Sequence, residues 1–196
     1  MILETIIITQ DIQGHVHVTP FGIQMQDDMV VISPFKPSAT LENILATRVA
    51  VMNLTDDVRM FAAALTGRKS SDTVLSNLTP ANKVAGFRLR NTLAHQELRL
   101  VSVEDDATRP KLFLQIVHQE NHQPFAGFNR AQASVIELAV LVSRLNRLPA
   151  EKIIQEMAYL QIAIDKTAGP RELEAWGWLV EAVENYQAAV KFENLA

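Results

Sequence analysis

The sequence contains no cysteine, and the usual fingerprints of several enzyme classes are missing as well. Without cysteine the chain cannot form disulfides, thiolate zinc sites or iron–sulfur clusters, and it cannot use a cysteine nucleophile. Its seven glycines are scattered through 196 residues, and none forms the GxGxxG or GxxxxGK[ST] pattern of phosphate-binding loops. The GxSxG elbow of many serine hydrolases is also missing.

An excess of positive charge and a long apolar run are lacking too. The chain has 18 Lys and Arg against 22 Asp and Glu, a net charge of −4, which argues against nonspecific binding to nucleic acid or anionic membranes. No apolar stretch approaches the roughly 18 residues of a membrane span. The opening stretch is interrupted by Glu4 and has no basic region before it, unlike an export signal. We therefore expect a cytoplasmic protein with no nucleic-acid partner and no membrane partner.

The first half of the chain has the pattern of β-strands. Leu3–Thr9 is rich in β-branched residues, and His15–Thr19 alternates with a period of two. We expect Pro20–Gly22 to interrupt this second strand, because proline cannot donate to a ladder, and pairing to resume over residues 23–26. Met29–Ser33 is predicted as a third strand.

Further elements follow in the first half. A short helix is predicted after Ser38, with Thr40 as its N-cap. Arg48–Asn53 is nearly all apolar, as in a strand buried on both faces. Residues 93–103 and 111–119 are predicted as a hairpin around the acidic turn 104–106.

From Asn129 onward the apolar period becomes helical. Three successive stripes predict three helices, and Pro149 and Pro170 stand where the first turns of the second and third should begin. Strands first and helices last predict an α+β chain, divided into residues 1–128 and 129–196.

The five histidines do not form a recognisable metal motif. His15 and His17 share a strand face, and His118 and His122 are four residues apart, which is a long separation in a strand. Neither pair resembles a zinc signature. We therefore interpret them as solvated or hydrogen-bonded strand histidines and expect no metal site.

The segment Ser33–Asn43 carries the best candidate binding site. It brings Lys36, Ser38 and Thr40 to the beginning of the predicted helix, where a cation, two hydroxyls and free N–H groups together suit a phosphate monoester. The alternative is that Ser38 and Thr40 only cap the helix and that Lys36 is solvated.

The order of short motifs resembles that of a known family. PFG at 20–22, SPFKPSAT at 33–40, NLTDD at 53–57 and GFNR at 127–130 together resemble the FMN-binding split-barrel proteins, which include flavin reductases and pyridoxamine-phosphate oxidases. The order is most similar to a small uncharacterised branch, a domain-of-unknown-function group in which helices follow the barrel. The resemblance implies a flavin-binding split β-barrel over 1–128 and a C-terminal three-helix subdomain over 129–196.

The resemblance also implies a set of cofactor-binding residues. Lys36, Ser38 and Thr40 would hold the FMN phosphate, with Asn43 supporting the loop. Phe21 and Gly22 would line the isoalloxazine ring, and Asn53, Thr55 and Asp56 would lie near its polar edge. Arg130 would reach the cofactor from the helical segment or from a partner subunit. Pro37 departs from the family pattern, where a small flexible residue is expected.

Some of these residues have a structural interpretation as well. Asn129 followed by Gln132 is a good N-cap and N3 pair, and Asp56 and Asp57 are suited to capping a helix. Arg130 at a helix start opposes the helix dipole, which favours a bound anion or a carboxylate partner there.

The leading functional hypothesis is a homodimeric flavoprotein that binds FMN noncovalently, with the flavin sites at the dimer interface. The family implies an oxidoreductase in which hydride reaches flavin N5 from a nicotinamide or another small-molecule electron donor. Binding of FMN or a related phosphorylated ligand without turnover is one alternative, and an interaction module that has lost its cofactor is another. The sequence assigns no catalytic residue, names no substrate, and leaves FAD or a deazaflavin open; His17 is the only proton-transfer candidate.

Overall fold

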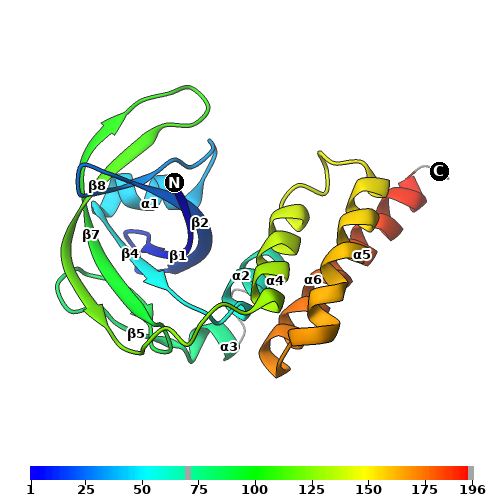
Figure 1. Cartoon of the computed structure of the whole chain (residues 1–196). Coiled ribbons are helices and arrows are strands. Elements are labelled where there is room, and N and C mark those ends of the chain that lie inside the picture. The colour runs from blue at the N-terminus through cyan, green and yellow to red at the C-terminus, as the bar shows by residue number, and fades with distance from the viewer. Residues whose placement is uncertain (69–71, 194–196) are drawn as a thin grey trace. The chain divides into compact units, whose positions relative to one another are not determined.

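The computed structural model describes residues 1–68 and 72–193 (Figure 1). Residues 69–71 and 194–196, the latter at the end of the expected helical subdomain, lie outside the described part. The chain divides into two compact units. The first comprises residues 1–56 and 72–125, and the second comprises 57–71 and 126–196.

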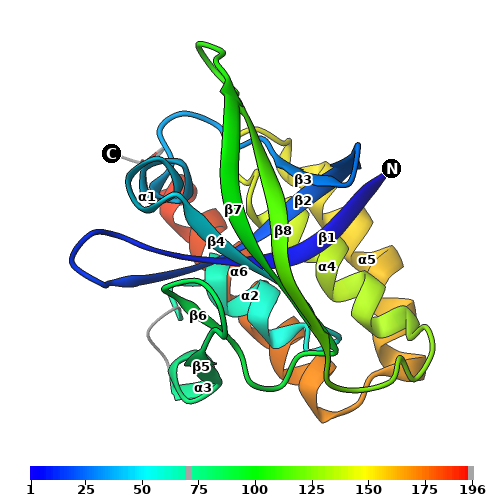
Figure 2. The same cartoon turned by 90° about the vertical axis from the view of Figure 1, so that its left-hand side faces the viewer.

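Six antiparallel strands of the first unit close into a barrel in the order β1-β2-β3-β8-β7-β4. Each strand pairs with its neighbours through ladder hydrogen bonds, and β7 and β8 form the long hairpin in green in Figure 2. The strands are β1 (Ile2–Gln10), β2 (Val16–Gln26), β3 (Met29–Ile32), β4 (Val49–Leu54), β7 (Ala94–Glu104) and β8 (Lys111–Asn121). This closed barrel followed by helices confirms the expected fold class.

The barrel core is built from the inward-facing residues of these strands. Ile7 of β1, Ile23 of β2 and Leu98 of β7 are fully buried in one cluster. Helix α1 (Ala39–Thr47) contributes Leu41 and Ile44 to the same cluster, so it packs against the barrel interior. Burial of this apolar surface is the main stabilising term, at about 25 cal/mol per Å².

Two local predictions were wrong. Strand β2 continues through Pro20, which stands opposite Ile6. Within the described chain, β2 pairs with β3 only over Gln24–Gln26, so proline's missing N–H falls where β2 has a single neighbour. The N-cap of α1 is Ser38 rather than Thr40: Ser38 has extended backbone, and its hydroxyl accepts from the Leu41 N–H at 3.4 Å.

Three small elements complete the first unit. They are α3 (Asp72–Leu75), β5 (Leu78–Pro80) and β6 (Phe87–Leu89), and the two short strands pair antiparallel. The loop between β5 and β6, residues 81–86, packs onto β7, because three of its backbone N–H groups bond to the Glu97 carboxylate.

The second unit is helical. It contains α2 (Arg59–Leu65), α4 (Arg130–Val142), α5 (Ala150–Thr167) and α6 (Pro170–Glu193). Pro170 is the first residue of α6 and Pro149 is the N-cap of α5. Helix α2 belongs to this unit because its apolar face packs on α4 and α6 and because Arg59 bonds to Glu174 of α6 at 3.3 Å. The domain boundary expected from the sequence, at residue 128, instead assigns α2 to the barrel domain.

Among the residues that the structure describes, none of the helices combines the length and apolar character needed to cross a membrane.

Candidate functional site

The predicted phosphate loop lies between β3 and α1. Lys36 is exposed and donates to Asp105 Oδ1 at 2.9 Å, while Ser38 caps α1. The Asp105 carboxylate is held below its ordinary pKa chiefly by the hydrogen bond from Lys36. An ammonium group and the N-terminus of a nine-residue helix are therefore brought together, with a carboxylate as the present partner of the ammonium group.

A second cation, Arg109, lies at the same loop, and sequence reasoning did not identify it. Its Nε donates to the Ser33 carbonyl at 2.9 Å, and its guanidinium stands 4.7 Å from the centre of the Phe35 ring. The Lys36 N–H donates to the Thr108 carbonyl at 2.9 Å. The segment before α1 is thus tied to the β7–β8 turn by its backbone and by two cationic side chains.

Thr40 and Asn43 lie on the buried side of α1. Thr40 is 1% exposed and Asn43 is 8% exposed. The Asn43 amide donates to Thr9 Oγ1 at 3.0 Å, which ties α1 to β1. Thr40 is therefore closed to a ligand as the chain stands, whereas Asn43 ties α1 to β1 and also lines a pocket of about 500 Å³.

Phe21 and Gly22 are adjacent in β2. Phe21 packs partly buried against the barrel core, and its carbonyl accepts from Thr5 Oγ1 at 3.0 Å. A Cβ at Gly22 would lie 2.8 Å from Ile2 Cγ2, so packing against β1 is a sufficient reason for glycine here. Gly22 also lines a cavity of about 240 Å³ that includes Arg109.

Asn53 is fully buried in β4. Its amide nitrogen donates to the Ile6 carbonyl at 3.2 Å, and its oxygen accepts from the Leu89 N–H at 2.8 Å. The side chain therefore joins three segments of the barrel unit. Thr55 and Asp56 follow at the end of the strand and are half-buried.

Arg130 is the first residue of α4 and is exposed. It belongs to the helical unit, whereas the other predicted site residues belong to the barrel unit. The helix begins at Asn129, whose Oδ1 accepts from the Ala131 N–H at 2.7 Å, as the N-cap interpretation predicted. Gln132 does not close the capping pair: it donates to Glu172 at 3.2 Å.

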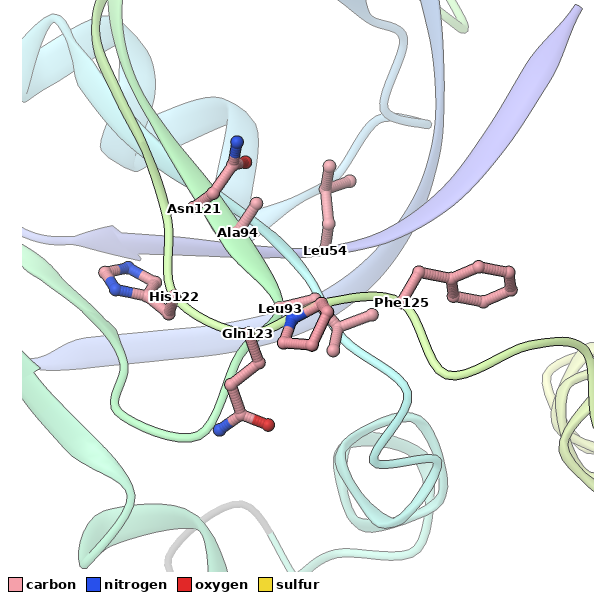
Figure 3. Close-up of a pocket in the computed structure, with 8 residues that line it drawn as sticks. Leu54, Leu93, Ala94, Asn121, His122, Gln123 and Phe125 are labelled. Atoms are coloured by element: carbon pink, nitrogen blue, oxygen red, sulfur yellow. The ribbon is translucent and has the colours of Figure 1, made fainter.

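An open pocket of about 580 Å³ lies where β4 and β8 end and β7 begins. Figure 3 shows Leu93 between His122 and Phe125, with Leu54 near it. The eight lining residues are Leu54, Leu93, Ala94, Asn121, His122, Gln123, Pro124 and Phe125. The pocket is mainly apolar. Of the two aromatic side chains that line it, only that of His122 carries polar atoms.

His122 contacts a cluster of histidine and glutamate side chains on the β7–β8 hairpin. Hairpin register sets His95 opposite Glu120 and Glu97 opposite His118, and side chains of directly opposite residues share a face. His95 Nδ1 is 2.9 Å from His122 Nε2, and His95 Nε2 is 3.2 Å from Glu97 Oε1. His95 and Glu97 are fully buried.

The Glu97 carboxylate is held by the loop before β6. It accepts backbone N–H bonds from Asn82 at 2.6 Å, Lys83 at 2.6 Å and Val84 at 2.8 Å. Burial alone would raise the pKa of Glu97, but these bonds and His95 outweigh it and hold the pKa below its ordinary value. Burial lowers the pKa of His95 despite the opposing bond to Glu97. An ionised Glu97 and a neutral His95 follow at neutral pH.

The sequence analysis did not predict this cluster, because neither strand by itself contains the whole set of residues. His95-Gln-Glu97 and His118-Gln-Glu120-Asn-His122 each place their titratable residues at every second position, so each set shares a strand face. Pairing these two patterns across the predicted hairpin would have found the cluster. His95 also stands opposite Asn53 on β4, so one strand links the cluster to a predicted flavin-site residue.

The fold resembles that of solved FMN-binding proteins. The structure matches the FMN-bound protein MM1853 from Methanosarcina mazei with a TM-score of 0.79 and 22% identity, covering 92% of this chain and 94% of that chain. The 2-nitrobenzoate 2-nitroreductase NbaA of Pseudomonas fluorescens matches with a TM-score of 0.52 and 19% identity, covering 61% and 64% of the two chains. An FMN-binding protein from Thermus thermophilus, with bound 1-cyclohex-2-enone, matches with a TM-score of 0.52 and 12% identity, covering 61% of this chain and 70% of that chain.

The chain belongs to the DUF447 family of proteins of unknown function. Residues 3–123 match the N-terminal domain model of that family, and residues 129–181 match the DUF447 model that follows it. The Methanosarcina mazei protein is assigned to the same family. Comparison with the curated proteins finds no match.

Proposed function

We propose that this protein binds FMN noncovalently, and that it is a flavin-dependent oxidoreductase acting as a homodimer. The observation that carries the proposal is the likeness to an FMN-bound member of the same family across both the barrel and the helices, over 92% of the chain. The resemblance of the motifs at 20–22, 33–40, 53–57 and 127–130 supports it independently of the fold.

The residues at the α1 start suit a flavin phosphate. Lys36 and Arg109 supply two cationic donors at one loop, and α1 adds N–H groups that carry partial positive charge. Asp105, the present partner of Lys36, is fully exposed at 84%, so exchanging it for a phosphate leaves no buried charge behind. Because Thr40 is buried, we assign it and Asn43 to positioning the loop.

We keep Gly22, Thr55 and Asp56 as residues that contact the flavin, and we assign Asn53 a structural role. Gly22 contributes a surface without a side chain, and Thr55 and Asp56 offer polar atoms at the end of β4. Asn53 holds the strand in place, since both ends of its amide are already bonded within the barrel. Bound FMN would supply hydride chemistry, while these residues bind it and orient it.

A homodimer would allow one site to draw on both units. Arg130 is exposed at the start of α4, which suits contact with a cofactor held by a partner subunit. Helix α5 has only Ile153 and Ile164 buried, while Ile154 and Ile162 are about half exposed. Isoleucines exposed at a spacing of eight residues form an apolar surface that favours association.

The first test is FMN binding by loop variants. We expect the double variant Lys36→Ala/Ser38→Ala to bind FMN about 10- to 100-fold more weakly in a calorimetric titration, because charged hydrogen bonds contribute roughly 1.5–3 kcal/mol. Lys152→Ala is the matched control, since Lys152 also pairs with a carboxylate, Glu156 at 3.1 Å, on the helical unit. Equal affinity in the double variant and the control would remove this loop from the site.

The second test separates catalysis from binding alone. An oxidoreductase should oxidise NADH or NADPH in an FMN-dependent manner, whereas a noncatalytic binder should hold FMN without turnover. A preparation with no flavin absorption, and with a melting temperature unchanged by FMN, would refute the flavoprotein proposal. FMN at 100 times its dissociation constant should stabilise the protein by about 2.7 kcal/mol.

A further inference from the structure

One face of the β7–β8 hairpin carries a set of side chains whose donor atoms could hold a metal ion. One ligand atom from each of His95, Glu120 and His122 lies within 4.8 Å of the others. His95 Nδ1 and His122 Nε2 are 2.9 Å apart. Two nitrogens bound to one ion at about 2.0–2.1 Å, with an angle of 90–109° between the bonds, stand roughly 2.9–3.4 Å apart. The two imidazoles are therefore already at ligand spacing.

The third donor can adjust to complete the set. Glu120 stands opposite His95 in the hairpin register, and its side chain is 46% exposed. Its Oε1 lies 3.9 Å from His122 Nδ1, and its Oε2 accepts from the Asn82 amide at 3.0 Å. Its donor atom lies within 4.8 Å of those of His95 and His122, and an exposed carboxylate can rotate toward them, while Asn82 limits where that carboxylate can go.

Glu97 fixes the orientation of His95 and is not itself a ligand. Its two oxygens already accept three backbone N–H groups, and His95 Nε2 is 3.2 Å from Oε1. Since the carboxylate accepts the Nε2 proton, the lone pair of His95 lies on Nδ1 and points toward His122. A carboxylate behind a histidine is the usual way in which proteins orient a metal-binding imidazole.

The charges around the cluster favour a cation. Glu97 and Glu120 are acidic, and the charge of Arg88 acts on both His95 and Glu120. The two carboxylates and the one guanidinium sum to one negative charge, which attracts a divalent ion. The proton between His95 Nδ1 and His122 Nε2 then moves to His122 Nδ1, on the side of Glu120.

We propose that His95, Glu120 and His122 bind a divalent transition-metal ion, with Glu97 holding His95 in position. Two imidazole nitrogens and one carboxylate oxygen, without sulfur, suit Zn²⁺, Fe²⁺ or Mn²⁺. Three protein ligands leave coordination positions open. His122 also lines the 580 Å³ pocket.

The test is metal binding by the full chain after treatment with a chelator. Zn²⁺ is titrated calorimetrically, and Co²⁺ is added in parallel because its visible spectrum reports nitrogen and oxygen ligation. We expect one equivalent of Zn²⁺ per chain in protein with and without FMN. His122→Ala should weaken binding by at least about 100-fold, beyond the loss typical of an outer-shell partner. Glu120→Gln should weaken it in the same direction.

The matched control is His15→Ala. His15 also stands beside a carboxylate, with its Nδ1 2.8 Å from Asp11 Oδ2, but it lies in the exposed β1–β2 turn. This variant should bind Zn²⁺ as the wild type does. Circular dichroism checks that His122→Ala keeps its fold. Absence of a stoichiometric Zn²⁺ signal in the wild type, or equal affinities of His122→Ala and His15→Ala, would overturn the proposal.

Discussion

Asn53→Ala provides a quantitative test of the role that the structure assigns to this residue. The substitution removes the acceptor of the Leu89 N–H at 2.8 Å and the donor to the Ile6 carbonyl at 3.2 Å, at a position that is fully buried. Each buried group left without a partner costs about 1–3 kcal/mol. For the two groups together we therefore expect a loss of roughly 2–6 kcal/mol in the free energy of unfolding, a large part of the 5–15 kcal/mol of a typical domain.

The assay is equilibrium unfolding in urea followed by far-ultraviolet circular dichroism, with linear extrapolation to water. Amide hydrogen exchange at Leu89 gives a local measurement, because that N–H loses its acceptor and should exchange faster. Asn121→Ala is the control: Asn121 is an exposed asparagine on β8, and its replacement should change stability by no more than about 0.5 kcal/mol. Equal stabilities of the two variants, with unchanged exchange at Leu89, would refute the structural role. A loss of FMN affinity at unchanged stability would instead return Asn53 to direct contact with the ligand.

Four further predictions concern other parts of the molecule. Asn129→Ala should cost about 1 kcal/mol in thermal unfolding by removing the α4 cap on the Ala131 N–H, and an unchanged melting curve would contradict it. Phe61→Ala, which empties a buried site in α2, should cost about 3–5 kcal/mol; a loss below that of Asn129→Ala would show that α2 is not packed as described. The pKa of Asp11 lies below its ordinary value chiefly because His15 bonds to it, so His15→Ala should raise that pKa in a carboxyl titration by nuclear magnetic resonance, and no upward movement would exclude this cause. Light scattering should give the mass of a dimer, and a monomer mass would contradict the proposed assembly.

Local patterns were enough to place most barrel strands and the three C-terminal helices. The β-branched run at Leu3–Thr9 became β1, and the change to a helical period after Asn129 marked the start of α4. Errors occurred where a neighbour decides the outcome. Pro20 is tolerated in β2 because that part of the strand has one pairing partner, and the apolar face of α2 packs on helices that come more than sixty residues later.

The candidate flavin site divides in the same way. The sequence predicted that a helix begins in this segment, since helix starts are local features, but it chose Thr40 rather than Ser38 as the cap. It could not show that Thr40 is buried. Nor could it show that the Asn53 amide bonds to Ile6 and Leu89, because those contacts join residues distant in the chain. Arg109 was missed for the same reason: it reaches the loop from the far side of the β7–β8 turn. The roles of these residues toward FMN stay predictions.

The composition excluded cysteine chemistry, and the spacing of apolar residues predicted most of the strands and helices. A chain without cysteine has no thiolate ligand and no thiol nucleophile in any fold, and strand and helix periods follow from backbone geometry alone. Only the tertiary structure decided which histidines meet. His95 and His122 lie 27 residues apart, and they share one face because of the hairpin register. A slip of one residue would turn one strand's set of side chains to the opposite face, so the cluster is a property of the pairing rather than of either strand.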